Sequence, residues 1–228
     1  MKQTPQIISL GGSLIVPKTG IDTKFLGEFK KIIAARVKRG ERFIIICGGG
    51  SVARQYQAAA STLGMLNRES LDWLGIHATR LNAHLVKTMF LPNVFGRVVT
   101  DPKPAQGFKE SVLAAAGWKP GCSTDFDAVL HARTHGVKRM FNLSNTDYVY
   151  DKDPNKFSDA KPIKQIAWKE FRKLVGNKWD PGLSAPFDPV AAKESERIGL
   201  EVVIVNGKNL RNLAKALAGE KFVGTVIK

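Results

Sequence analysis

Cysteine is scarce in this chain, and its two copies show no pairing pattern. Cys47 and Cys122 are the only cysteines among 228 residues. They lie far apart and have neither CxxC spacing nor a nearby histidine pair, which argues against a disulfide framework and against a structural zinc site. We expect both to be free thiols, with Cys122 serving packing or backbone geometry rather than acting as a nucleophile.

Long apolar runs are also missing. No segment reaches the roughly 20 apolar residues that a membrane-spanning helix needs, and the N-terminus shows no signal-peptide core. Hydrophobic residues make up 43% of the chain and aromatic residues only 8%, with a mean hydropathy of -0.14. These values predict a globular protein, which we expect to be cytoplasmic and not membrane-bound.

Several common catalytic motifs are absent. A Walker A loop would need Gly-Lys-Ser/Thr, and Gly207-Lys208-Asn209 fails at the last position. The sequence contains no GxSxG elbow and no HExxH pair, so its histidines do not indicate a hydrolase or a zincin. His131 and His135 share one helical face, where we expect surface or packing roles.

Acidic residues are outnumbered, 20 to 35, which gives a formal net charge of +15. Such a charge suits a nucleic-acid partner, but it equally suits an enzyme that gathers anionic nucleotides. The basic residues are dispersed and form no stripe interleaved with aromatic residues. We therefore expect a solvated basic surface and no specific nucleic-acid partner.

What the chain does have is glycine placed at the ends of apolar segments. Residues 7–10 run into Gly11-Gly12-Ser13, and residues 43–47 run into Gly48-Gly49-Gly50. A strand, a backbone without side chains and a helix N-terminus together favour phosphate binding. Ser51 fits the N-cap of the second helix, and Arg54 adds a cation in its first turn. Two such loops predict a site for a polyphosphate or for two phosphorylated ligands.

The second loop also satisfies the dinucleotide pattern GxGxxG/A through Gly48, Gly50 and Ala53. That pattern requires an acidic residue at the end of the next strand, about 20 positions on. Glu69 and Asp72 have this spacing, but they introduce a long helix instead. The dinucleotide interpretation is therefore disfavoured.

Strand-like and helix-like segments alternate along the chain. Apolar β-branched runs predict strands at 6–10, 42–47, 95–99, 112–116, 139–143, 201–205 and 222–227. Helical periodicity and caps predict helices at 22–38, 51–63, 71–90, 121–135, 187–198 and 210–217. Residues 145–162 are polar and turn-rich. This order predicts an α/β fold, a three-layer α/β/α sandwich with a mostly parallel central sheet whose ligands lie beyond the strand carboxyl ends.

Five segments, in this order, resemble the amino-acid kinase superfamily and, within it, the archaeal-type UMP kinases. They are residues 9–13, residues 48–50 with Arg54, residues 119–125, residues 144–154 and residues 187–193. The resemblance covers essentially the whole chain. Residues 145–154 and the Asp-Pro-x-Ala-Ala-Lys run are its specific parts, because glycine clusters occur in many phosphate-binding proteins.

The resemblance implies transfer of the γ-phosphoryl group of ATP to UMP with Mg²⁺, without a phosphoenzyme. It assigns ATP contacts to Gly11, Gly12, Ser13, Gly50, Arg54, Ser144, Asn145, Tyr150 and Asp153. It assigns UMP contacts to Gly49, Asp72, Lys119, Pro120, Gly121, Cys122, Ser123, Thr124 and Asp125. Residues at the transferring phosphoryl group would be Gly12, Arg54, Lys193 and Asp188, the last orienting Lys193 or capping its helix.

Two departures from the family pattern stand out. Many members carry a lysine two residues before the first Gly-Gly, where this chain has Ser9. Archaeal-type UMP kinases also lack this lysine. The positive charge that this lysine supplies would then come from Arg54, Lys193 or magnesium. Tyr148 replaces a usual glycine. Spacing alone assigns no protein ligand to a metal, because Mg²⁺ is often held by phosphates and water.

The resemblance further implies one domain over residues 1–228, with a UMP-binding lobe to about residue 136, an ATP-binding lobe beyond it, and a homohexamer. Three alternatives remain: another small-molecule kinase of this superfamily, a nucleotide-binding sensor or storage protein that lost catalysis, and a basic nucleic-acid binder. We also expect a side chain added at Gly49 or Gly50 to damage transfer far more than folding.

Overall fold

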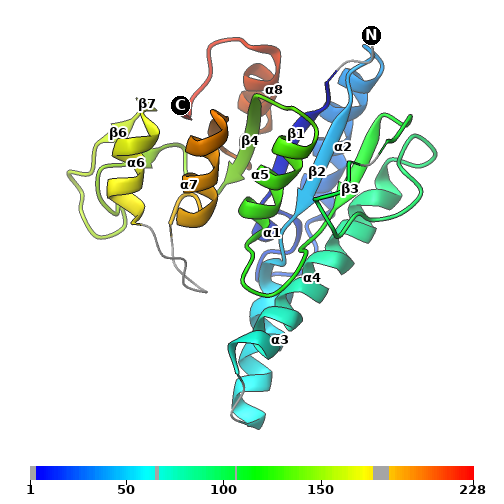
Figure 1. Cartoon of the computed structure of the whole chain (residues 1–228), viewed down its shortest axis with the longest axis horizontal. Coiled ribbons are helices and arrows are strands. Elements are labelled where there is room, and N and C mark those ends of the chain that lie inside the picture. Colours follow the sequence, from blue (N-terminus) through cyan, green and yellow to red (C-terminus); the bar gives the residue numbers. More distant parts are fainter. Residues whose placement is uncertain (1–3, 65–66, 106, 177–184) are drawn as a thin grey trace.

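The computed structural model describes residues 4–64, 67–105, 107–176 and 185–228, and it contains a central seven-stranded sheet (Figure 1). The strand order is β3-β2-β1-β4-β8-β9-β7, parallel throughout except that β9 runs antiparallel to β8. The bounds are β1 Gln6–Leu10, β2 Phe43–Cys47, β3 Val112–Ala115, β4 Arg139–Ser144, β7 Gln165–Ile166, β8 Glu201–Asn206 and β9 Thr225–Ile227. A separate antiparallel pair joins β5 Val149–Tyr150 to β6 Pro162–Ile163.

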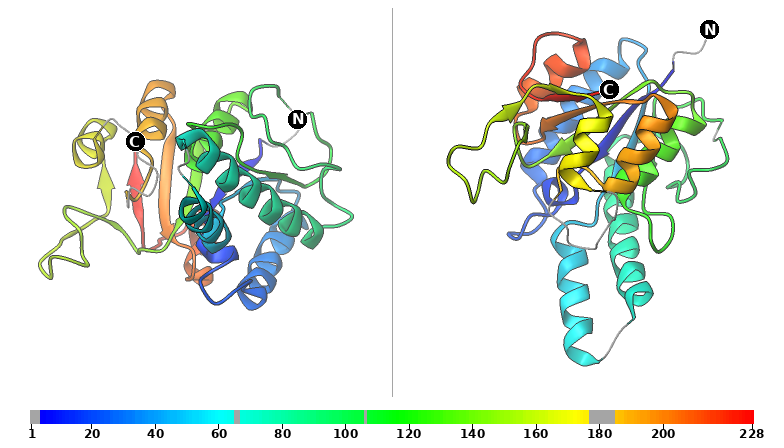
Figure 2. Two further views of the ribbon diagram at one scale, coloured as in Figure 1. Left: turned by 90° about the horizontal axis from the view of Figure 1, so that it is seen from below. Right: turned by 60° about the vertical axis from the view of Figure 1, so that its left-hand side comes forward.

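Helices cover both faces of this sheet, which confirms the predicted three-layer sandwich. Their bounds are α1 Gly12–Ile15, α2 Thr23–Val37, α3 Gly50–Leu63, α4 Arg68–Met89, α5 Thr124–Thr134, α6 Trp168–Val175, α7 Pro189–Ile198 and α8 Leu210–Ala218. Figure 2 shows α3 and α4 running side by side away from the sheet. No helix within the described part of the chain is long and apolar enough to cross a membrane.

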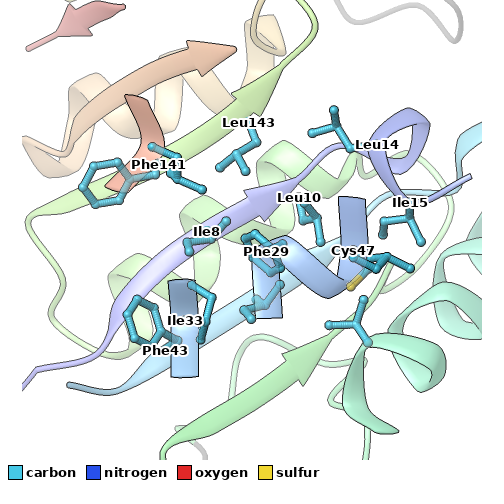
Figure 3. Close-up of a cluster of buried hydrophobic side chains, with 14 of the residues drawn as sticks. Ile8, Leu10, Leu14, Ile15, Phe29, Ile33, Phe43, Cys47, Phe141 and Leu143 are labelled. Carbon is cyan, nitrogen blue, oxygen red and sulfur yellow. The ribbon is translucent and has the colours of Figure 1, made fainter. Parts of the chain in front are cut away.

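Successive side chains of each strand point to opposite faces of the sheet, so the interior is divided into two apolar clusters. Ile8, Phe43 and Phe141 pack with Phe29 and Ile33 of α2 and with residues of α4 and α8 (Figure 3). On the opposite face, residues such as Ile7 and Ile44 pack with α5, α6 and α7. Burial on both faces explains why the strands read as continuous apolar runs, and it leaves polar residues for the strand ends.

Side-chain caps fix where three helices begin. Asp22 Oδ1 accepts a hydrogen bond from Phe25 N at 2.9 Å, Ser123 Oγ from Phe126 N at 3.1 Å, and Asp188 Oδ1 from Ala191 N at 2.6 Å. The predicted Ser51 cap is wrong. Helix α3 already begins at Gly50, and the Ser51 hydroxyl instead donates to Pro17 O at 2.9 Å.

Other local predictions were also wrong. Residues 95–99 form no strand, because only Val94 and Val99 make isolated bridges to β3. The turn-rich stretch after β4 contains the β5–β6 pair, and α1 and α6 were not predicted. His131 is buried at 1% exposure, which agrees with a packing role, one of the two roles expected for it. These errors lie in short or irregular segments, whereas the strands at the centre of the sheet were predicted well.

Candidate functional site

The two glycine loops meet at the carboxyl ends of β1 and β2 and interlock through their backbones. Gly48 N donates to Leu10 O at 3.0 Å, and Ser51 N donates to Val16 O at 2.9 Å. A Cβ added at Gly12 would lie 2.1 Å from Gly50 N and 2.5 Å from the Gly48 carbonyl carbon. Glycine is therefore required here by the packing of one loop on the other, before any ligand arrives.

This packing makes one sequence-based expectation wrong. Gly50 has a φ of +66°, and a Cβ there would lie 2.4 Å from Gly12 O. A Cβ at Gly49 would meet Ala53 Cβ at 2.7 Å and Gly75 O at 3.3 Å. A side chain at Gly50 would therefore disrupt the fold itself, and one at Gly49 would force helix α3 against its neighbours.

Arg54 connects the two loops from the first turns of α3. Its Nη2 lies 3.4 Å from Ser13 Oγ, and the guanidinium is exposed. The structure therefore brings Gly11, Gly12, Ser13, Gly50 and Arg54 together, as the sequence predicts for an ATP phosphate site. A cation beside open backbone amides is suited to stabilise phosphoryl oxygens.

Ser9, two residues before the first Gly-Gly, hydrogen-bonds to a carboxylate. Its Oγ donates to Asp125 Oδ1 at 3.1 Å, and Asn142 Nδ2 donates to the same oxygen at 3.3 Å. Loss of hydration and the nearby Asp188 raise the pKa of Asp125 to about 6, and the Ser9 hydrogen bond partly offsets this. This polar cluster joins β1, β4 and the start of α5 beneath the glycine loops.

Asp188 holds the start of α7 and adjoins this cluster. Its carboxylate caps Ala191 and interacts with Ser123, and its backbone N–H lies 3.4 Å from Asp125 Oδ2. Burial raises the pKa of Asp188. Lys193, one turn further along α7, is exposed, and its ammonium group makes no hydrogen bond or ion pair to another described residue. The capping role of Asp188 is thus present, whereas Lys193 is left free to meet an anion.

The predicted acceptor residues, 119–125, lie in the stretch 117–125, which follows β3, runs into the start of α5 and is called the acceptor segment below. Gly121 N donates to Asp72 Oδ2 at 2.8 Å, so Asp72 holds the turn of this segment. The Lys119 ammonium lies 4.4 Å from the centre of the Trp118 ring. Burial, and secondly Asp127, raise the pKa of Cys122 to about 11, which fits a packing position and not a nucleophile.

The residues that the sequence predicts to contact the ATP nucleoside line a cavity of about 310 Å³ beyond β4. Ser144, Asn145, Tyr150 and Asp153 all border it, together with residues of α6 and the segment before α7. Tyr148, the departure from the family pattern, also lines the cavity, edge-on to Tyr150 with ring centres 6.4 Å apart. Asp147 points elsewhere and accepts from Asn206 Nδ2 at 2.9 Å.

A sequence model of the amino acid kinase family matches residues 4–206. The chain belongs to the amino acid kinase family. It is 32% identical to the uridylate kinase of Methanobrevibacter smithii, with 97% of each chain covered. It is 31% identical to the uridylate kinase of Hyperthermus butylicus, with 100% of this chain and 99% of that one covered.

Solved structures of amino acid kinase relatives share its architecture. The crystal structure of uridylate kinase from Archaeoglobus fulgidus superposes with a TM-score of 0.85 at 30% identity, covering 98% of this chain and 100% of that chain. The UMP kinase of Bacillus anthracis superposes with a TM-score of 0.81 at 19% identity, covering 99% and 96%. At that lower identity the likeness concerns the fold alone.

Among the residues that the structure describes, no three His, Cys, Asp or Glu side chains are grouped so that they could hold a metal ion.

Sequence reasoning missed three polar residues of α4. Thr79 and Asn82 are buried at 6% and 3% exposure, and Arg80 is partly buried. All three contact the loops of the site, and none belongs to a recognised motif. The available signal was the presence of polar residues on a helix face shared with Ala78 and Ala83, where burial demands a hydrogen-bond partner.

Proposed function

We propose that this protein is a uridylate kinase that transfers the γ-phosphoryl group of ATP to UMP and forms UDP. The observation that carries the proposal is the interlocking of the two glycine loops, with Arg54 joining them. A donor cavity lies on one side of these loops and the acceptor segment on the other. The uridylate kinase relatives, aligned over nearly their full length, support the same assignment.

In this proposal the loops act by position and charge. Gly11, Gly12 and Ser13 receive the ATP phosphates, with Gly50 and Arg54 on the donor side and Gly49 on the acceptor side. A UMP phosphate oxygen attacks the γ-phosphorus in line, and the bond to the bridging oxygen of ADP breaks. Phosphoryl transfer needs orientation and charge cancellation more than covalent help. Lys193 neutralises the moving charge, and Asp188 positions it by starting α7.

The remaining assignments follow the two lobes. Residues up to about 136 bind UMP through Asp72 and the segment 119–125, and the rest binds ATP, whose Mg²⁺ enters with the nucleotide. We further propose that the chain self-associates as a homohexamer. Exposed apolar side chains on the protruding helices support association, namely Tyr56 at 62%, Leu63 at 88% and Leu81 at 64%. Light scattering of the purified protein measures the assembly.

The test is turnover with a panel of acceptors. Purified protein with Mg·ATP should phosphorylate UMP in preference to CMP, AMP and small carboxylic or phosphate acids. Lys193→Ala and Arg54→Ala should each lower kcat about 100-fold, the effect of removing one charge-stabilising donor. Lys31→Ala, an exposed lysine of α2, is the control. Turnover of a non-nucleotide but not UMP, or full activity in both variants, contradicts the proposal.

A further inference from the structure

One helix, α4, contacts both the triple-glycine loop, residues 48–50, and the acceptor segment. On its buried side, Asn82 Nδ2 donates to Gly48 O at 2.8 Å and to Gly49 O at 3.1 Å. These two carbonyls belong to the triple-glycine loop. Because Asn82 is only 3% exposed, its side chain binds the backbone of the loop and is not available to contact a ligand.

One turn earlier, the same helix holds the acceptor segment. Thr79 Oγ1 accepts from Gly117 N at 2.8 Å. The Arg80 guanidinium donates to Gly117 O at 3.4 Å and to Trp118 O at 3.0 Å. Asp72, two turns before Arg80, accepts from Gly121 N at 2.8 Å. Backbone groups along residues 117–121 are thus fixed by side chains of a single helix.

The opposite side of the segment is fixed as well. Trp118 N donates to Asp127 Oδ2 of α5 at 3.1 Å. The indole ring of Trp118 lies 4.4 Å from the Lys119 ammonium and 4.8 Å from that of Lys103. Hence the carbonyl of Trp118 is bound by α4 and its amide by α5, which leaves this residue little freedom to shift.

We propose that α4 is a rigid spacer that sets the distance between the triple-glycine loop and the acceptor segment. Arg80 is the principal positioning residue for the acceptor segment, and Asn82 is the positioning residue for the triple-glycine loop, the transfer side. The inference rests on the proposed transfer to UMP. A helix keeps Thr79, Arg80 and Asn82 at fixed spacing, so both loops move as one unit. Reacting atoms must stay within about 3–3.5 Å, and a misplacement of about 1 Å can cost 100-fold in rate.

Kinetics of Arg80→Gln, beside Arg39→Gln, test the acceptor side. Arg39 is exposed at the end of α2 and serves as the matched loss of one arginine. We expect Arg80→Gln to raise KM for UMP about tenfold, since a charged hydrogen-bond donor to the loop is lost, with KM for ATP within about twofold. Arg80→Lys, which keeps one cationic donor, should recover part of the loss. A merely destabilised enzyme would lose active protein and change neither KM.

Asn82→Ser tests the transfer side, because the shorter side chain loses both carbonyl contacts. We expect kcat to fall about tenfold or more while both KM values stay within about twofold, since the glycine loop positions the moving group rather than either nucleoside. Equal rises of both KM values in Arg80→Gln, or a kinetic profile of Asn82→Ser like that of Arg80→Gln, would overturn the spacer role.

Amide hydrogen exchange tests the spacer independently of catalysis. In Arg80→Gln, the amides of Gly117, Trp118, Lys119 and Gly121 should exchange several-fold faster than in wild type, and in Arg39→Gln they should not. If wild type fails to phosphorylate UMP but exchange in this segment still quickens, the proposed function fails and the positioning of the loop stands. Unchanged exchange in Arg80→Gln contradicts the positioning itself, whatever the turnover with UMP.

Discussion

Two regions at the sheet edge are built by different means: the loop region, which comprises the two glycine loops and residues 117–121, and the cavity region beyond β4. In the loop region, backbone packs on backbone at Gly12 and Gly50, and α4 binds loop carbonyls through Asn82 and Arg80. In the cavity region, side chains surround an open cavity of about 310 Å³, beside a hairpin whose strands are two residues long. One region is shaped before a ligand arrives, and the other offers room for a ligand to fill.

The difference tells where substitutions should act. Where backbones touch, any added atom has no space to occupy, and the cost falls on folding. Where side chains line a cavity, truncation removes contacts to the ligand and leaves the fold alone. Between these extremes lie Thr79, Arg80 and Asn82 of α4, whose loss should loosen a loop without removing a contact to substrate.

The largest effect is expected at the interlocked loops. Gly12→Ala places a Cβ 2.1 Å from Gly50 N, and neither backbone can retreat without breaking the hydrogen bonds of β1 and β2. We expect a loss above about 4 kcal/mol, which is exceptional for one methyl group, seen as insoluble or unfolded protein. Thermal unfolding by circular dichroism measures it.

Gly27→Ala supplies the matched control for this prediction. Gly27 is exposed within α2, and nothing lies within 4 Å of an added Cβ. The substitution should stabilise the protein by about 0.5–1 kcal/mol, the helix-propensity gain. If Gly12→Ala melts as Gly27→Ala does, the two loops are not interlocked as described.

In the cavity region, the predicted effect is kinetic. Tyr150→Ala removes an aromatic wall of the cavity and should raise KM for ATP about tenfold, from lost stacking and burial, with KM for UMP and the melting temperature nearly unchanged. Phe157→Ala is the control, because Phe157 is 49% exposed and does not line the cavity. A rise confined to KM for UMP would mean that the cavity holds the nucleoside of UMP instead of that of ATP.

How far the sequence anticipated this structure depends on how local each feature is. Strands such as residues 43–47 were predictable because burial on both faces demands an unbroken apolar run. Residues 95–99 carry a similar pattern but bridge β3 only at isolated points. Local propensity does not determine whether a partner strand runs alongside for long enough to pair.

The site shows the same limit. The glycine loops were predictable because each depends on a strand and the residues directly after it. The hydrogen bond from Ser9 to Asp125 spans 116 positions in sequence, and it exists only because α5 begins above the end of β1. The sequence therefore left the partner of Ser9 open, and no motif contains Asn82 or Arg80, whose partners are backbone atoms set by the tertiary fold.

The smallest effect is expected within the loop region, where Asp127 holds Trp118. Burial raises the pKa of this carboxyl to about 7, because the ionised form loses hydration and Oδ1 has no described partner. The folded protein then binds more protons than the unfolded chain between about pH 4 and 7. The stabilising effect of this carboxyl is thus complete below about pH 4 and is lost as pH rises through 7.

Asp127→Asn isolates that dependence, since the amide keeps a carbonyl oxygen for Trp118 N and carries no charge at any pH. Relative to the variant, wild type should lose a few degrees of melting temperature between pH 5 and pH 8.5. Comparing the two proteins cancels the other titrating groups, including Asp125, whose pKa is raised in the same direction. A melting-temperature difference that stays constant across this range would mean that Asp127 is ionised in the folded protein throughout it.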